Sequence, residues 1–210
     1  MTEFEWTQLR TLLWKEWRQV RGLFFMVLAI LAGGPLYLAW VEGITQDTDS
    51  FLVGLFQIAA FLGALGFGVL SYGLEFNDHT DQYLATRPLA HPRTFLVKTG
   101  LGLALSAAVG LVASIATLLV ARMMNQEWTY IAGEIAPYWW ILGPCIYLAV
   151  MTAILAIPPI IPSLIAACLI ALGMVAMSMK IWALPVLLAP VFLFLSYQLA
   201  YRRVYLAPAR

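Results

Sequence analysis

Six apolar stretches, each close in length to a membrane-crossing helix, constrain the fold of this chain more than any other feature of its sequence. A helix needs about 20 apolar residues to cross the hydrocarbon core of a bilayer. Because backbone groups in lipid must find their hydrogen bonds within the chain, such segments fold as α-helices. We therefore predict an all-α integral membrane protein with six transmembrane helices. The stretches cover approximately Gly22–Val41, Phe51–Tyr72, Thr99–Leu119, Tyr138–Ile157, Ile160–Met179 and Trp182–Leu199.

The composition agrees with this class of protein. Hydrophobic residues make up 62% of the 210 residues and charged residues 11%, whereas soluble domains carry about 25% charged residues. The formal net charge is +1, so the chain lacks the basic field with which proteins bind nucleic acid. We expect one transmembrane domain, residues 1–210, in contact with membrane lipids and not with nucleic acid.

Prolines divide the fourth stretch from the fifth. The two stretches together are too long for one span, and Pro158 and Pro159 lie at their junction. Proline breaks a helix because it lacks the backbone N–H and clashes with the preceding turn. This pattern predicts two helices joined by a tight turn.

The segment before the first span, residues 1–21, has the pattern of an amphipathic helix. Trp6, Leu9, Leu13 and Trp17 fall on one face at about 100° per residue. Tryptophans with flanking arginines are typical of a helix that lies at the lipid–water interface. The alternative is a helix that docks on a partner or on the protein's own core.

Basic residues predict the orientation in the membrane. Ten of the 12 Lys and Arg residues fall on one side of the six predicted spans. Because Lys and Arg accumulate on the cytoplasmic side, we expect cytoplasmic N- and C-termini in a multi-pass protein of the plasma membrane, the inner membrane of a bacterium. The ten residues are Arg10, Lys15, Arg18, Arg21, Arg87, Arg93, Lys98, Arg202, Arg203 and Arg210.

The polar stretch between the second and third spans, residues 73–98, concentrates the chain's versatile side chains. We predict a short helix over residues 78–87, ended by Pro88. One face of this region suits a groove on a partner. Pro92 is expected to begin a second helix, which continues through Arg93 and Lys98 into the third span. The predicted contact face consists of Phe76, Thr80, Tyr83, Leu84 and Arg87.

The same stretch is also the place where an enzyme or a metal site would lie. Asn77, Asp78, His79, Asp81 and His91 are the residues that such a site would use. Helix capping by Asp78, with Asp81 in the first turn, explains the acidic residues more simply. We therefore expect no catalytic residues and no metal in this chain.

Several motifs are absent from the sequence. There is no Gly-rich phosphate-binding loop that ends in Gly-Lys-Ser or Gly-Lys-Thr, so we do not expect ATP hydrolysis by this chain. The six spans as bounded above contain no Asp, Glu, Lys, Arg or His. Ion-coupled carriers usually keep such groups within the membrane, so this absence disfavours a secondary transporter.

The loop resembles the one between the second and third spans of type-2 ABC exporter permeases. The resemblance is carried by Glu75, Thr80, Tyr83-Leu84, Arg87-Pro88 and Lys98. The segment Leu13-Trp14-Lys15-Glu16-Trp17-Arg18 is similar to the interfacial elbow helix of that family. The layout of six spans with cytoplasmic termini is similar as well.

This resemblance implies a permease subunit of an ABC transporter, in particular an exporter, driven by a separate ATP-binding subunit that holds ATP and Mg²⁺. The loop would be the coupling helix, and Pro88, Arg93 and Lys98 would connect it to the third helix. The permease would form a dimer with a second copy or a homologue. The alternatives are a membrane enzyme or metal-binding protein that uses the loop, and a membrane scaffold that transports nothing. The residues expected to contact the ATPase are Glu75, Phe76, Thr80, Tyr83, Leu84 and Arg87.

Overall fold

The computed structural model describes residues 3–40, 46–77, 91–123, 138–157, 160–178 and 183–202. Within these ranges all regular secondary structure is helical and there is no strand, as the sequence predicts. The helices are α1 (Glu3–Trp40), α2 (Gln46–Asn77), α4 (His91–Met123), α6 (Trp139–Ala156), α7 (Ile160–Ser178) and α8 (Ala183–Tyr201).

Four of these helices contain stretches long and apolar enough to cross a membrane. The stretches are Val53–Tyr72, Pro92–Leu119, Trp139–Ala156 and Ala183–Tyr201. The apolar part of α7, Ile161–Ala176, is shorter. The predicted first span, 22–41, is not among the four found in the described ranges. The described helices thus agree with an all-α membrane protein by length and composition, and the number of six spans stays a prediction.

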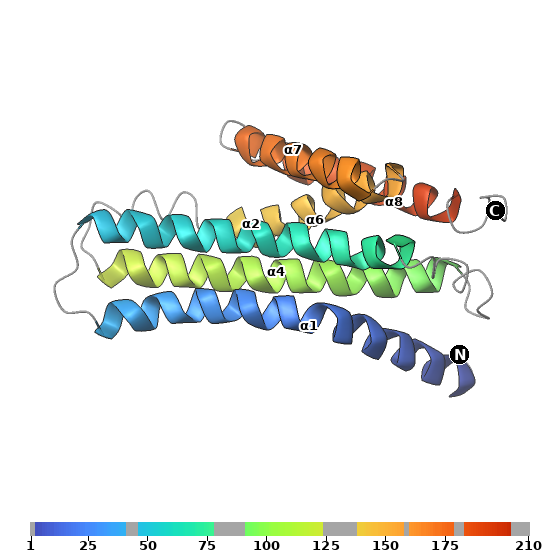
Figure 1. Ribbon diagram of the computed structural model, residues 1–210, viewed down its shortest axis with the longest axis horizontal. Coiled ribbons are helices and arrows are strands. Elements are labelled where there is room, and N and C mark those ends of the chain that lie inside the picture. Colours follow the sequence, from blue (N-terminus) through green and yellow to red (C-terminus); the bar gives the residue numbers. More distant parts are fainter. Residues whose placement is uncertain are drawn as a thin grey trace.

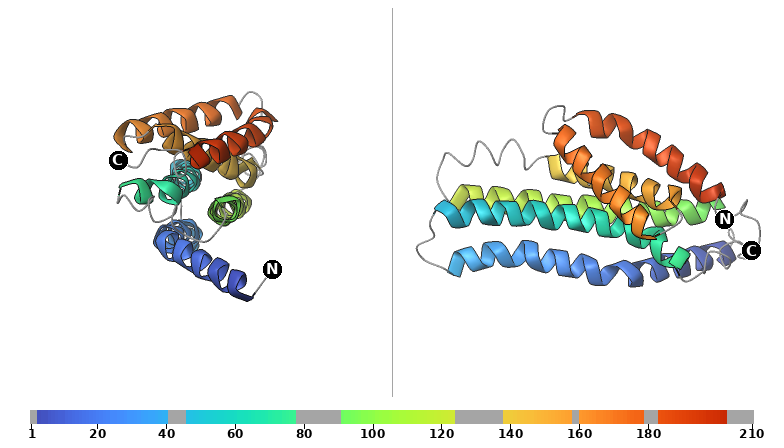
Figure 2. Two further views of the ribbon diagram at one scale, coloured as in Figure 1. Left: turned by 90° about the vertical axis from the view of Figure 1, so that its right-hand side faces the viewer. Right: turned by 45° about the horizontal axis from the view of Figure 1, so that its top comes forward.

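Helix α6 lies at the centre of the bundle. Helices α1, α2 and α4 run side by side as the longest elements, and α7 and α8 cross them at an angle (Figures 1 and 2). Helix α6 packs against α2 and α4 on one side and against α7 and α8 on the other. Its span is 78% buried, compared with 17% for α8. A helix that is apolar on all sides suits either a protein core or lipid. The buried helix α6 fits the first environment, and the exposed helix α8 fits the second.

Small residues bring α4 and α6 into close contact. A Cβ atom added at Gly102 would overlap the ring of Tyr147, and one added at Gly143 would lie 2.9 Å from the carbonyl oxygen of Ser106. Glycine is therefore required where the two helices cross, because any side chain would push them apart.

Helix α1 continues without a break through the boundary expected at residue 21. The predicted interfacial segment and the predicted first span form one helix, which bends along its length in Figure 1. The predicted interfacial residues Trp6 and Leu13 are exposed, and Leu9 and Trp17 are partly buried. The side of α1 that packs on the core is a different one, with buried residues Leu12, Glu16, Val20, Val27 and Leu31.

The helix boundaries follow proline chemistry. Helix α6 ends at Ala156, and Ile157 is extended with φ −110° and ψ 109°. The residue before a proline avoids the helical conformation, and Pro158 follows Ile157. Helix α7 then begins at Ile160. The predicted separation of the fourth and fifth stretches is confirmed.

Candidate functional site

A buried ion pair between α1 and α4 is the most unusual feature of the apolar bundle. The ammonium nitrogen Nζ of Lys98 lies 3.0 Å from Oε1 of Glu16, and the side chains are 0% and 4% exposed. Both charges are thus removed from water. Desolvation costs several kcal/mol per ion, and mutual attraction offsets it only when further polar contacts complete the site.

Helix α2 supplies such contacts. Nζ of Lys98 also donates a hydrogen bond of 3.1 Å to the backbone carbonyl oxygen of Ser71. The same nitrogen lies 5.0 Å from the centroid of the Tyr72 ring, close enough for a cation–π interaction. Lys98 therefore joins three helices, α1, α2 and α4, at one atom.

Helix α6 closes the site through Tyr147. The hydroxyl of Ser71 lies 2.8 Å from the carbonyl oxygen of Phe67 and 3.0 Å from the hydroxyl of Tyr147. Each hydroxyl carries one hydrogen. Because a carbonyl oxygen only accepts, Ser71 donates to Phe67, and Tyr147 donates to Ser71. The hydroxyl of Tyr147 is also 3.4 Å from the backbone oxygen of Lys98.

The cavity for the Tyr147 ring exists because residue 102 is glycine. A Cβ at Gly102 would overlap the ring atoms of Tyr147 and its hydroxyl oxygen. On the same helix turn, Thr99 donates to the sulfur of Met151 at 3.9 Å. The buried polar cluster thus consists of Glu16, Ser71, Lys98, Thr99 and Tyr147, and it connects α1, α2, α4 and α6.

This cluster joins helices α1, α2, α4 and α6 through an ion pair and hydrogen bonds. Glu16, Ser71, Lys98, Thr99 and Tyr147 are all buried. Their contacts run to one another, to backbone oxygens and to the sulfur of Met151. Removing one charged partner would leave the other buried without compensation, so the four helices are held in one mutual arrangement.

The structure places the predicted coupling residues as follows. Lys98 is buried in the cluster and Arg93 is partly buried. Helix α4 begins at His91 and runs unbroken through Arg93 and Lys98 into the apolar span, as predicted. Glu75 and Phe76 lie in the last turn of α2; their side chains are outside the described residues. Thr80, Tyr83, Leu84, Arg87 and Pro88 lie wholly outside the described residues.

The sequence reasoning missed Glu16, Ser71 and Tyr147. Glu16 is separated by four residues from Leu12 and from Val20, so it lies on one face with them. A carboxylate on the same face as the apolar residues Leu12 and Val20 requires a cation when that face is buried. The position of Glu16 among them was therefore the sequence signal for an ion pair. The spans as bounded by sequence began at Thr99, one residue after Lys98; in the structure the apolar stretch begins at Pro92 and includes Lys98. Contrary to the prediction, the third span therefore contains an ionisable residue, Lys98.

Metal ligands do not gather in the part of the chain that the structure describes. No group of three or more His, Cys, Asp or Glu residues lies close enough together there to hold a metal ion. Of the residues considered for such a site, Asp78, His79 and Asp81 are outside the described ranges. The chain matches no family model, no curated protein and no solved structure.

Proposed function

We propose that this chain is the permease subunit of an ABC exporter, with residues 73–98 as the coupling loop for a separate ATP-binding subunit. The observation that supports this proposal best is the position of Lys98. It is the last residue of the proposed loop and lies on the unbroken helix α4, and its side chain contacts α1 and α2 in the interior of the bundle.

The geometry gives a route for a mechanical signal. A displacement of the loop acts on the start of α4, because the helix continues from His91 into the apolar span. At Lys98 the displacement reaches Glu16 on α1 and the Ser71 carbonyl on α2. Packed interiors transmit strain because they have little free volume. Movement of the loop would thus shift several helices together.

In this proposal Glu75, Phe76, Thr80, Tyr83, Leu84 and Arg87 contact the ATP-binding subunit, and Pro88, Arg93 and Lys98 connect this contact to α4. The partner would bind ATP and Mg²⁺, and two permease copies, or one copy and a homologue, would form the membrane pathway. The plasma membrane and cytoplasmic termini belong to the same proposal, which the distribution of Lys and Arg supports.

The proposal predicts that an ATP-binding protein is encoded beside this chain, and the test reconstitutes the two together in proteoliposomes. Tyr83→Ala is expected to weaken binding of the ATPase, because an aromatic anchor is lost from the contact face. The double variant Glu16→Leu/Lys98→Met replaces the ion pair by apolar side chains. We expect it to bind the ATPase normally and to lose the stimulation of ATP hydrolysis by the permease.

The control is Arg122→Met on α4, whose side chain is exposed. It should leave binding and stimulation unchanged. Full stimulation by both the Tyr83→Ala and the double variant would refute the coupling role of the loop. Failure of any ATP-binding protein to associate with the purified chain would refute the permease assignment itself.

A further inference from the structure

A surface groove between α1 and α4 lies beside the buried ion pair and is separate from it. The groove has a volume of about 710 Å³ and is lined by Arg10, Thr11, Leu13, Trp14, Trp17 and Leu101. This volume falls within the range of about 300–1,000 Å³ that is typical of small-molecule sites. Trp14 is 57% exposed and Leu13 is 46% exposed, so the groove is open to its surroundings.

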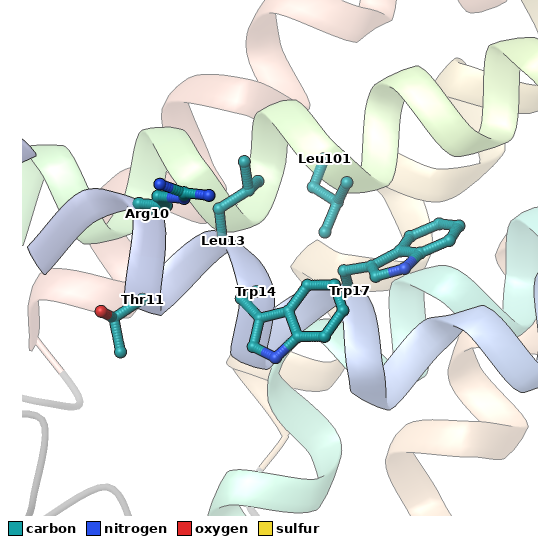
Figure 3. A pocket seen from close by; sticks show the side chains of 6 residues that line it. All are labelled: Arg10, Thr11, Leu13, Trp14, Trp17 and Leu101. Atoms are coloured by element: carbon teal, nitrogen blue, oxygen red, sulfur yellow. The ribbon is translucent and has the colours of Figure 1, made fainter. Parts of the chain in front are cut away.

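The lining combines one cation with a long apolar surface. Figure 3 shows Arg10 and Thr11 at one end, the indole rings of Trp14 and Trp17 along the groove, and Leu101 approaching from α4. Arg10 and Trp14 are four residues apart and so lie on one face of α1. The hydroxyl of Thr11 donates to the carbonyl oxygen of Thr7 at 2.8 Å, and Arg10 is the charged donor among the described residues that line the groove.

The position of the groove matches the boundary between headgroups and acyl chains. Leu101 belongs to the first half of the apolar stretch Pro92–Leu119. The Trp17 ring contacts the Phe25 ring edge to face, with centroids 6.0 Å apart. Phe25 is 58% exposed, so the aromatic surface continues from the groove along α1. Tryptophan and arginine are the residues that anchor helices at this depth in a membrane.

The charge beside the groove favours an anion. Arg10, Arg18 and Arg21 are exposed on α1. Glu16, the acidic residue nearest to the groove in sequence, is neutralised by Lys98 and is 4% exposed. A guanidinium binds a phosphate through two parallel hydrogen bonds. Among the lining residues whose side chains the structure describes, none carries a carboxylate.

We propose that this groove binds an anionic phospholipid, with the phosphate at Arg10 and an acyl chain along Trp14, Trp17 and Leu101. An apolar groove with a terminal cation matches the two parts of such a lipid. The inference requires that the chain lies in a membrane, and it is independent of the ABC permease assignment.

The experiment is native mass spectrometry of the purified full chain in mild detergent, titrated with dioleoyl phosphatidylglycerol or with dioleoyl phosphatidylcholine. The wild-type chain should bind phosphatidylglycerol more tightly. Arg10→Gln should weaken phosphatidylglycerol binding about five-fold, the effect of one basic residue at an anionic lipid surface, and leave phosphatidylcholine binding unchanged. Trp14→Ala should weaken the binding of both lipids.

Arg18→Gln is the matched control. It removes the same charge from the same helix, and Arg18 is exposed but does not line the groove. Its lipid binding should change less than two-fold. An equal loss in Arg18→Gln and Arg10→Gln would overturn the proposal, because general surface charge would then explain the preference. Equal wild-type binding of the two lipids would overturn the role of Arg10. A dimer that Trp14→Ala dissociates would assign the groove to a second copy of the chain instead.

Discussion

Replacing Lys98 by methionine gives the sharpest test of the buried polar cluster. The substitution keeps a long apolar side chain and removes the charge. It leaves the carboxylate of Glu16, which is 4% exposed, without its cation. Breaking a buried pair from one side costs about 3–5 kcal/mol. The hydrogen bond to the Ser71 carbonyl, measured at 3.1 Å, is lost as well, but its contribution overlaps with that of the pair.

The expected shift in melting temperature follows from this range. For a chain of 150–250 residues, 1 kcal/mol corresponds to about 2–4 °C. A loss of about 4 kcal/mol therefore lowers the apparent Tm by about 8–16 °C. The assay is thermal unfolding of the purified protein in detergent, followed by its tryptophan fluorescence. Arg122→Met is the control for loss of a cation on the same helix, and it should shift the Tm by less than about 2 °C because the side chain is exposed.

A double-mutant cycle separates the ion pair from other effects. Glu16→Leu leaves the Lys98 ammonium buried without its carboxylate, so it should destabilise the protein by a similar amount. The double variant Glu16→Leu/Lys98→Met contains no buried charge at this position. Apolar replacement of a complete buried pair is often neutral or stabilising. We expect the double variant to melt above either single variant. Single-variant losses that simply add would refute the pairing.

Two further substitutions test the contacts of α6. Tyr147→Phe removes the donor to Ser71, whose own bond to Phe67 remains; it should cost about 1 kcal/mol, seen as a Tm lower by about 3 °C. Gly102→Ala should cost about 1–3 kcal/mol through overpacking against the Tyr147 ring. Gly100→Ala is the control, because an added Cβ there meets nothing within 4 Å. It should leave the Tm unchanged or raise it, because alanine favours a helix over glycine by up to about 1 kcal/mol. Equal losses of stability at Gly100 and Gly102 would contradict the α4–α6 geometry.

Most of the helical architecture could be predicted from the sequence because each element depends on local patterns. Apolar length predicts a span, and Pro158 marks the end of α6 through its effect on Ile157. The continuity from Pro92 into the third span was predicted in the same way and is confirmed. Helix α1 continues across residue 21, where the predicted interfacial segment meets the predicted first span, because a change from polar to apolar sequence does not by itself interrupt a helix.

The buried polar cluster could be predicted only in part because its contacts are long-range. Ser71 and Tyr147 are 76 residues apart, and Lys98 and Ser71 are 27 apart. Periodicity assigns a residue to a face of its own helix, but it does not identify the helix that lies opposite. Lys98 was identified from its place after the loop. The burial of Glu16 depended on which side of α1 faces α4, and the tryptophans favoured a different side of that helix.

The central position of α6 has a consequence for synthesis at the membrane. Chains are made from the N-terminus, so α1, α2 and α4 exist before the helix that fills the space between them and α7 and α8. Until α6 arrives, Ser71 lacks the hydroxyl of Tyr147 and the surface around Gly102 has no covering helix. The Lys98–Glu16 pair can form earlier, since both residues belong to the helices made first. The nascent protein thus acquires its ionic contact before the close packing of α4 on α6.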